Sequence, residues 1–362
     1  SLNQFENGSC RSPIGSRIAI LGDTVVLAIS TIEKPFDGLW SGGVTQSTGP
    51  VDQNQGFHLP VLLAETLDRL LVHPGGIYLD ATLGEGGHSS GLLQLSTPEG
   101  RVLGIDRDPR SFARAADRLE RFGDRFIPLQ GSYTQMVAMA NQHGFDRVDG
   151  VLMDLGLSSR QLDTPGYGFS FQTDEPLDMR FDPNGPLSAD DVVNNYSEED
   201  LANVIFQYGE EPRSRRIARA IVRNRPVNST GQLASLVASA IGPSSRQGRR
   251  VHPATRTFQA LRIEVNDELT NVEAGLSAAI ELLAPSGRLA VISYHSLEDR
   301  IVKTFLQRES SMCICPPGFP VCVCEHEPTV NLVNRRVIKP TPEEVTGNPR
   351  SRSARMRVAE RR

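Results

Sequence analysis

The chain has 362 residues, of which 38% are hydrophobic and 22% are charged, with 32 glycines and 24 prolines. This composition is typical of a globular protein with more than one core, and it excludes fibrous and wholly disordered classes. The net charge of -5 excludes a uniformly basic nucleic-acid binder. No apolar run reaches the roughly 20 residues of a membrane span, and the five cysteines do not form the pattern of a disulfide framework. We therefore expect a cytoplasmic protein that does not contact a membrane.

Residues 1–50 mix glycine, serine, threonine and proline without a sustained period. We predict a poorly ordered N-terminal extension for this segment. Val51 offers an alternative translation start, which leaves open whether the extension belongs to the native protein.

From residue 57 onward, helical and strand patterns alternate. In chain order, we expect a helix over 62–71, a strand over 77–81, a helix from about 89, a strand over 102–105, a helix over 109–122, a strand over 126–130, a helix over 133–143, a strand over 150–154, a helix over 276–283 and a strand over 288–293. This alternation predicts an α/β fold of the Rossmann-like class, with a parallel sheet between layers of helices.

The alternation stops after residue 159 and resumes at about 267. The intervening sequence is acidic and rich in turns, and then shows helical patterns over 197–208 and 213–224. We predict an inserted helical domain over residues 161–266.

The α/β domain then consists of residues 51–160 and 267–330. Beyond residue 328 the sequence is basic and contains several prolines. We expect residues 331–362 to form a basic C-terminal arm rather than a packed element.

A glycine-rich turn follows the first strand of the expected sheet. Asp80 ends that strand, and Gly84, Gly86 and Gly87 precede the next helix. Glycines of this kind let backbone N–H groups and a helix N-terminus approach a ligand, although they also serve tight turns and helix packing. Asp106 ends the next strand, where an acidic side chain can accept hydrogen bonds from ribose hydroxyls. The pair predicts an adenosine-type cofactor.

Nicotinamide dinucleotides and S-adenosylmethionine both fit this pattern. The turn lacks the third glycine of G-x-G-x-x-G, and no later segment places a His or Tyr acid beside a Lys for hydride transfer. The residues therefore favour methyl transfer, and an NAD-dependent oxidoreductase is the alternative.

Titratable residues follow two further strands. Asp154 ends one of them, and His295 and Glu298 follow a later one. Carboxyl ends of parallel strands form the ligand-binding edge of such a sheet, so these side chains are candidate catalytic groups. The alternative is structural, because an Asp can cap a turn and acidic residues favour the first turn of a helix.

Arginines gather in the expected helical domain. Arg215, Arg219 and Arg223 recur every four residues and predict a basic stripe on one helix. Arg256 and Arg262 flank an aromatic residue, a pairing that suits RNA. The alternative for both groups is a solvated face of an amphipathic helix.

Cys313-x-Cys315 and Cys322-x-Cys324 present four thiols, the number and ligand type of a tetrahedral zinc site. The C-x-C spacing is less usual for that purpose than C-x-x-C. The alternative is a loop of reduced thiols, and we assign no metal ligand among the site residues.

Seven segments taken together closely resemble the bacterial MraW family, over roughly residues 58–359. They are residues 80–88 (DATLGEGGH), 105–109 (IDRDP), 154–163 (DLGLSSRQLD), 168–171 (GFSF), 176–180 (PLDMR), 252–260 (HPATRTFQA) and 295–300 (HSLEDR). The resemblance implies a Rossmann-like S-adenosylmethionine-dependent methyltransferase with an inserted helical domain. It also implies N4-methylation of a cytosine in the decoding region, at the P site, of 16S ribosomal RNA, with the small ribosomal subunit as partner.

The resemblance also implies which residues bind the cofactor. They are Gly86, Gly87, His88, Asp106, Tyr133, Asp154 and Gln161. Asp106 would hold the ribose, and Tyr133 would lie beside the adenine. The insertion would recognise RNA.

Cytosine's exocyclic amine is a poor nucleophile because its lone pair is delocalised into the ring. We hypothesise that Asp154 or a nearby backbone carbonyl localises this lone pair, and that His295 or Glu298 helps to remove the proton. The Asp/Asn-Pro-Pro-Tyr signature of many amino-methyltransferases is absent, because residues 154–157 read DLGL. A non-catalytic RNA-binding assembly factor is a further alternative, and the oligomeric state, monomer or homodimer, stays open.

Overall fold

The computed structural model describes residues 16–21, 24–29, 60–242, 252–316 and 321–362. The chain divides into residues 1–58 and 59–362. In the first unit, β1 (Ser16–Leu21) pairs antiparallel with β2 (Thr24–Ile29). The rest of the predicted N-terminal extension lies outside the described residues.

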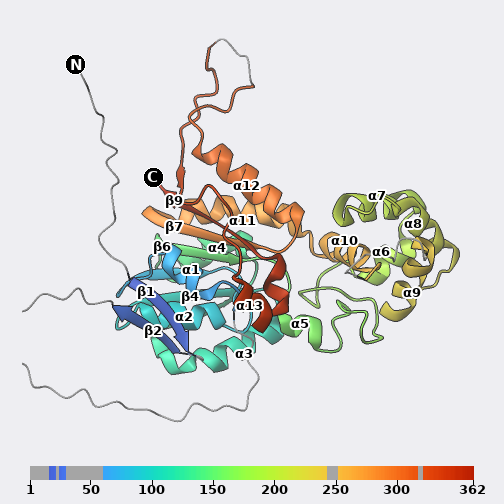
Figure 1. Ribbon diagram of the computed structural model, residues 1–362, viewed down its shortest axis with the longest axis horizontal. Helices are drawn as coiled ribbons and strands as arrows, with labels where there is room; N and C mark the ends of the chain where they lie inside the picture. The colour runs from blue at the N-terminus through green and yellow to red at the C-terminus, as the bar shows by residue number, and fades with distance from the viewer. Residues whose placement is uncertain (1–15, 22–23, 30–59, 243–251, 317–320) are drawn as a thin grey trace, which may run out of the picture. The chain divides into compact units, whose positions relative to one another are not determined.

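The second unit contains a seven-stranded sheet in the order β5-β4-β3-β6-β7-β9-β8 (Figure 1). Its strands are β3 (Ile77–Asp80), β4 (Arg101–Asp106), β5 (Phe126–Gln130), β6 (Val148–Asp154), β7 (Leu283–Ser293), β8 (Val330–Leu332) and β9 (Arg355–Arg361). Strands β3 to β7 are mutually parallel, as the sequence predicted. The chain proceeds outward from β3 in one direction and from β6 in the other, so the switch point of the sheet lies between these two strands.

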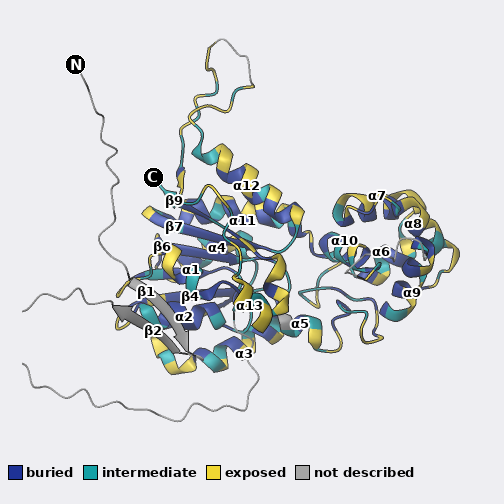
Figure 2. Cartoon of the chain, in the orientation of Figure 1, coloured by how far each residue is buried: buried dark blue, intermediate teal, exposed yellow. Residues whose placement is uncertain are grey.

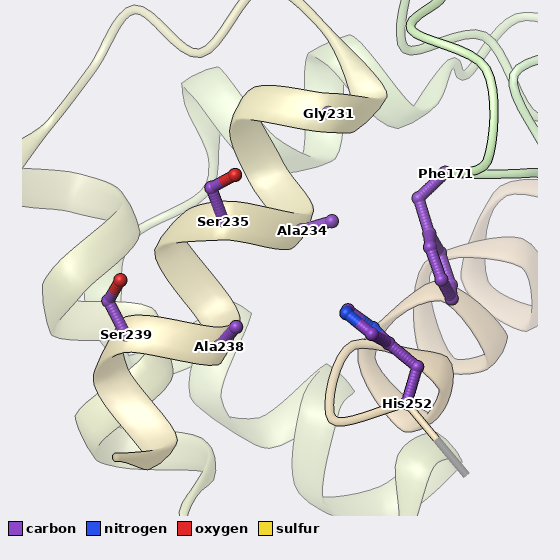
Figure 3. Close-up of a pocket in the computed structure, with 7 residues that line it drawn as sticks. All are labelled: Phe171, Gly231, Ala234, Ser235, Ala238, Ser239 and His252. Carbon is purple, nitrogen blue, oxygen red and sulfur yellow. The ribbon is translucent and has the colours of Figure 1, made fainter. Parts of the chain in front are cut away.

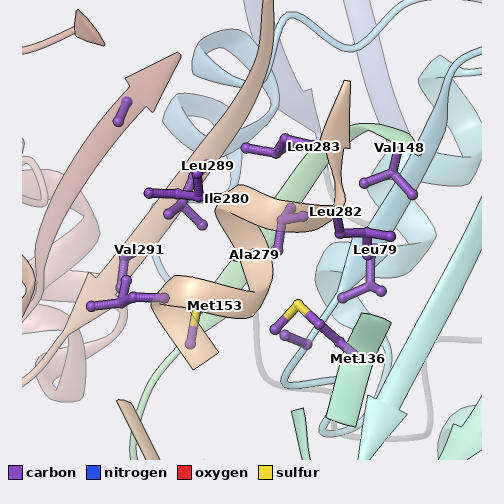
Figure 4. Close-up of a cluster of buried hydrophobic side chains, with 14 of the residues drawn as sticks. Leu79, Met136, Val148, Met153, Ala279, Ile280, Leu282, Leu283, Leu289 and Val291 are labelled. Carbon is purple, nitrogen blue, oxygen red and sulfur yellow. The ribbon is translucent and has the colours of Figure 1, made fainter. Parts of the chain in front are cut away.

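Helices pack against this sheet. In chain order, they and the short 3-10 turns of the α/β domain are α1 (Leu63–Arg69), α2 (Gly87–Leu95), α3 (Pro109–Leu119), η1 (Glu120–Arg125), η2 (Tyr133–Gln135), α4 (Met136–Gln142), α5 (Ser159–Asp163), α11 (Glu268–Leu282), α12 (Ser296–Ser310), α13 (Pro342–Gly347) and η4 (Pro349–Ser353). Figure 4 shows Ile280 of α11 beside Leu289 of β7 in the main core, to which Ala279 and Val291 also belong. Within the described residues, no helix is both long enough and apolar enough to span a bilayer.

The predicted helical insertion is confirmed. It consists of α6 (Ala189–Asn195), α7 (Glu198–Gly209), α8 (Ser214–Arg223), α9 (Thr230–Ile241) and α10 (Thr255–Asn266). Each of these helices has buried residues (Figure 2), and their apolar side chains form a second core that includes Ile205, Ile217 and Leu261. The sequence predicted this unit because its apolar residues recur at helical spacing. The exact bounds of 161–266 stay a prediction.

Glu210 links the insertion to the α/β domain. It follows α7 in the left-handed conformation, with φ of 47°. Its carboxylate accepts hydrogen bonds from the Arg300 side chain at 2.9 Å and from the Ser296 hydroxyl, both in α12. The pKa of Glu210 lies below its usual value because of these two bonds.

The expectation of a C-terminal arm is wrong for residues 355–361. These residues form β9, which pairs antiparallel with β7, and Met356 and Val358 are buried. Arg355 and Arg357 bond the carboxylate of Asp299 in α12. The arginine density suggested a solvated arm, but alternation of apolar and basic residues also fits a half-buried strand whose charges are paired.

Replacing Met356 by Ala is expected to lower the free energy of unfolding by about 2–4 kcal/mol, because its fully buried side chain leaves a cavity. Chemical denaturation of the two proteins measures this difference.

Met312→Ala is the matched control, since that side chain is 74% exposed and its removal should change the stability by less than about 0.5 kcal/mol. Equal, small effects at both positions would mean that the C-terminal segment is an unpacked arm after all.

Candidate active site

The glycine turn after β3 has the tight backbone that its sequence predicted. Gly84 and Gly86 have φ of 51° and 74°, a region that favours glycine, and Gly86 immediately precedes α2. At Gly87, a Cβ atom would lie only 2.4 Å from Cγ of Pro60. Backbone conformation and packing therefore account for these glycines, and their contact with a cofactor stays a prediction.

Asp80 holds this turn in place. Its carboxylate accepts a hydrogen bond from the Ser89 hydroxyl at 2.7 Å and from the Thr82 N–H at 3.2 Å. The Thr82 hydroxyl in turn accepts the Asp154 N–H at 2.6 Å. The turn is thereby joined to the end of β6 across the switch point. Burial raises the pKa of Asp80.

Asp106 closes the other side of the turn. One carboxylate oxygen accepts the Gly84 N–H at 2.7 Å, and the other accepts the Asp108 N–H at 2.8 Å. Burial raises the pKa of Asp106 to about 7, although both hydrogen bonds oppose this. The side chain is where the sequence placed it, at the carboxyl end of β4.

Gln161, a predicted cofactor ligand, is engaged by neighbouring protein groups. Its side-chain amide donates to Asp108 at 3.0 Å and accepts the Ser158 N–H at 3.0 Å. Asp108 also accepts the hydroxyl of Tyr167 at 2.5 Å. Burial alone would raise the pKa of Asp108, but these hydrogen bonds together lower it. Gln161 thus joins the loop after β6 to the start of α3.

Three polar side chains meet at the end of β6. Asp154 accepts a hydrogen bond from the Tyr294 hydroxyl at 2.9 Å, and its other oxygen lies 3.6 Å from Nε2 of His88. His88 is buried, and neither ring nitrogen has a hydrogen-bond partner in the part of the chain that the structure describes. Burial, and then the negative charge of Asp154, raise the pKa of Tyr294. His88 therefore offers buried, unsatisfied nitrogens beside a carboxylate.

His295 and Glu298 form the second predicted group, at the start of α12. Glu298 is buried and accepts the backbone N–H groups of Tyr294 and His295 at 2.9 and 3.2 Å. Nε2 of His295 lies 3.1 Å from Oε1 of Glu298 but lacks the alignment of a hydrogen bond. Burial opposes ionisation of Glu298, but His295 and then Arg262 outweigh it and lower its pKa.

Gly156 lies between these two groups. Its φ of 93° favours glycine, and a Cβ atom there would lie 3.7 Å from the Tyr294 ring and 3.9 Å from Oε1 of Glu298. The backbone after Asp154 thus runs past both groups. This arrangement brings all three predicted catalytic residues, Asp154, His295 and Glu298, to one edge of the sheet.

Tyr133 begins η2 and packs against α11. A Cβ atom at Gly275 would lie 2.6 Å from its ring, so the glycine makes room for the tyrosine. Burial raises the pKa of Tyr133. The proposed contact with an adenine is not tested by this packing.

The predicted RNA-contacting arginines do not form one group. Arg215, Arg219 and Arg223 are exposed on α8, and Arg219 bonds Glu198 at 3.2 Å. Arg262 instead makes a largely buried, two-bond ion pair with Glu268, at 2.7 and 2.8 Å.

Arg256 is exposed on α10 and bonds the carbonyl of Glu210 at 3.1 Å. It also lies 3.6 Å from the Glu211 carboxylate, which is fully buried. Arg256 therefore supports the chain after α7 as well as reaching solvent.

The insertion also has a pocket of about 400 Å³ between α9 and the start of α10. Figure 3 shows Phe171 and His252 facing Ala234 and Ala238 of α9 across it. The rings of Phe171 and His252 lie 4.6 Å apart between centroids. This pocket thus has an aromatic wall and a small-residue wall.

The sequence prediction missed three polar residues of the site. Tyr294 directly precedes the segment 295–300 and received no role, and Asp108 lies within the segment 105–109 but received no role of its own. Glu268 gave no signal, because its pairing depends on the sharp turn at Asp267, where φ is 49°. Tyr294 alone was within reach of a sequence argument, since it directly follows a strand of the sheet.

Comparison with known proteins identifies relatives of the chain. The model of the MraW methylase family matches residues 55–362. A ribosomal RNA small subunit methyltransferase H from Dehalococcoides mccartyi is 54% identical over 304 residues, which are 84% of this chain and 86% of that protein. One from Thermomicrobium roseum is 53% identical over 307 residues, 84% of this chain and 93% of that protein.

Solved structures resemble the chain less closely. An rRNA methylase from Streptococcus thermophilus is 10% identical, with a TM-score of 0.38, covering 84% of this chain and 99% of that one.

Proposed function

Because the chain belongs to the MraW methylase family, we propose that it methylates the N4 amine of a cytosine in the decoding region, at the P site, of 16S ribosomal RNA. S-adenosylmethionine is the methyl donor. The observation that carries the proposal is the grouping of His88, Asp154 and Tyr294 at the switch point, beside the glycine turn. An NAD-dependent oxidoreductase has no comparable support.

The residues at this edge fit S-adenosylmethionine. The cofactor carries ribose hydroxyls, an amino group and a carboxylate, and its sulfonium supplies an electrophilic methyl group. Asp106 offers a carboxylate for the hydroxyls, at the end of β4. His88 offers buried nitrogens that lack partners among the described residues. We assign Gly86 and Gly87 to the same binding edge, since Gly86 immediately precedes α2 there and Gly87 begins it.

Asp154 is our proposed acceptor for the cytosine amine. An acceptor that hydrogen-bonds the amine N–H groups orients them so that the nitrogen lone pair leaves conjugation with the ring and becomes available for in-line attack. Asp154 is held by two neighbours, the Tyr294 hydroxyl and, through its N–H, Thr82, so its orientation is fixed before substrate arrives.

His295 and Glu298 are our proposed route for the proton. The amine becomes strongly acidic once methyl transfer begins, so a base is needed only late in the reaction. Glu298 is ionised, because its pKa is lowered, and lies 3.1 Å from the His295 ring. Nδ1 of His295 accepts the Glu298 N–H at 3.4 Å, so we propose that Nε2 accepts the proton and that the Glu298 carboxylate, 3.1 Å away, stabilises the resulting imidazolium.

The insertion is our proposed RNA-recognition domain. Its helix α8 has exposed arginines, which suit phosphate groups, and its pocket has an aromatic wall on which a base can stack. The largely buried pair of Arg262 with Glu268 removes that arginine from our proposed RNA surface. Arg256 stays in it.

A triple variant tests the exposed arginines of α8: Arg215→Ala, Arg219→Ala and Arg223→Ala. We expect it to raise KM for small-subunit RNA by about tenfold or more while kcat changes little. In our proposal these arginines contact backbone phosphates rather than the reacting atoms. The salt dependence of binding should also become shallower, by about two units in the log-log slope. Filter binding at several salt concentrations, with steady-state kinetics, measures both.

The matched control removes three positive charges outside the insertion, with Arg69→Ala, Lys303→Ala and Arg336→Ala, which are all exposed. If the control variant lost the same affinity for RNA, the effect would come from the change in net charge and not from Arg215, Arg219 and Arg223 on α8.

We also propose a cytoplasmic location, because the substrate is ribosomal RNA.

The experiment that tests the function incubates the purified protein with labelled S-adenosylmethionine and unmodified small subunits. Labelled RNA is the expected product. Binding of NAD without labelling would favour an oxidoreductase, and RNA binding that survives Asp106→Ala without any labelling would favour an assembly factor. Naked RNA in a parallel reaction identifies the form of the substrate.

A further inference from the structure

The segment between α12 and β8 gathers four free cysteines in two C-x-C pairs. All four sulfur atoms lie within 4.8 Å of one another. The separation is 3.4 Å from Cys313 to Cys322, 3.5 Å from Cys322 to Cys324, and 3.8 Å from Cys313 to Cys324. Cys315 completes the group.

These separations are those of a sulfur tetrahedron around one metal ion. A zinc–sulfur bond of about 2.3 Å sets the edge of such a tetrahedron at about 3.8 Å. A disulfide requires a much shorter sulfur separation, about 2.05 Å. We propose that Cys313, Cys315, Cys322 and Cys324 bind one structural zinc ion. The sequence spacing alone did not favour a metal, and the sulfur geometry is the new observation.

Backbone N–H groups also point to the sulfur atoms. Ile314 donates to Cys324, Cys315 donates to Cys313, and Val323 donates to Cys315, each at 3.4 Å. Hydrogen bonds of this kind favour the thiolate form, which is the form that binds metal, and they orient the ligands. The chain is therefore folded around the four thiols.

This segment has no core of its own. None of its described residues, 311–316 and 321–329, is buried, and Met312, Val321 and Val323 are more than two-thirds exposed. Near its return to the sheet, the Thr329 N–H donates to the Glu309 carbonyl at 2.8 Å in the last turn of α12, and the Thr329 carbonyl accepts the Arg362 N–H at 3.0 Å. A short segment that buries so little apolar surface needs another source of stability, which a structural metal supplies.

The test measures zinc in the full-length protein, purified with a reductant. We expect about one zinc per chain, and at least about a tenfold loss of zinc in the double variant Cys313→Ser, Cys322→Ser. Cobalt added to the metal-free protein should give the intense visible absorption of tetrahedral thiolate coordination. The matched control is Cys10→Ser, which removes the one cysteine of the sequence outside this segment.

Two further measurements separate metal binding from general misfolding. S-adenosylmethionine affinity should be unchanged in the double variant, because the proposed cofactor residues lie elsewhere in the fold. Cys315→His should keep the metal and shift the cobalt spectrum, since an imidazole replaces one thiolate as ligand. Three results would overturn the proposal. The reduced wild-type protein could take up neither zinc nor cobalt, the double variant could keep its zinc, or the site could hold only iron.

Discussion

Replacing Asp154 by Asn lowers the rate of methyl transfer at saturating S-adenosylmethionine by at least about a hundredfold, whatever the change in cofactor affinity. The carboxamide keeps an oxygen that can accept the Tyr294 hydroxyl, so the fold around residue 154 is preserved. It loses the negatively charged oxygen that we propose accepts the N–H hydrogen bonds of the cytosine amine and so localises its lone pair. Single-turnover kinetics with small subunits, and titration calorimetry with the cofactor, measure the two quantities.

Asp117→Asn is the control for this experiment, because that aspartate is exposed on α3. Its turnover should equal that of the wild type. If Asp154→Asn turned over at the wild-type rate, Asp154 would have no part in the chemistry, and a backbone carbonyl near Gly156 would become the candidate acceptor.

Replacing Asp106 by Asn weakens S-adenosylmethionine binding by about a hundredfold. Both carboxylate oxygens accept backbone N–H groups, from Gly84 and Asp108, and an amide has only one oxygen to offer. The variant therefore loses a proposed ribose acceptor and loosens the glycine turn. Asp124→Asn, at an exposed aspartate of η1, is the matched control for the binding titration.

The pH dependence of binding tests the same residue. Because burial raises the pKa of Asp106 to about 7, the carboxyl becomes neutral as the pH falls below that value. Cofactor affinity should then fall by up to about tenfold per pH unit below pH 7, and Asp106→Asn should remove this dependence. An identical pH profile in the two proteins would exclude Asp106 as the ribose acceptor.

The contribution of Asp106 to folding stability changes with pH in the opposite direction to its contribution to cofactor affinity. Its pKa in the folded protein is above the unfolded value of about 3.9, so folding binds a proton. This contribution is fully present below pH about 4 and is lost as the pH rises through about 7. Because cofactor affinity falls and folding stability rises as the pH is lowered, measuring both against pH distinguishes weaker binding from weaker folding.

The sequence predicted the parallel strands closely because each is an apolar run bounded by turn residues. For β5 the predicted and observed bounds, 126–130, are the same. The helix predicted from residue 276 begins eight residues earlier, at Glu268. Its first turns carry polar residues that obscured the helical period, and Glu268 is buried only because it pairs with Arg262.

The candidate site was predictable to the extent that strand ends determine it. Asp154 and His295 each follow a parallel strand, so the topology of the sheet brings them to one edge. The inward direction of Arg262 was not predictable, because it depends on the left-handed turn at Asp267 between α10 and α11. In the sequence, Arg262 flanks an aromatic residue just as the exposed Arg256 does, and no residue type near it indicated burial.

The measurement that most directly tests our central claim is nucleoside analysis of small-subunit RNA after reaction with labelled S-adenosylmethionine and the purified protein. We predict that the label appears in N4-methylcytidine, at a single cytosine of the decoding region, and that Asp154→Asn yields little of it. Label in any other nucleoside, or no label in RNA that binds the protein, would contradict the assignment.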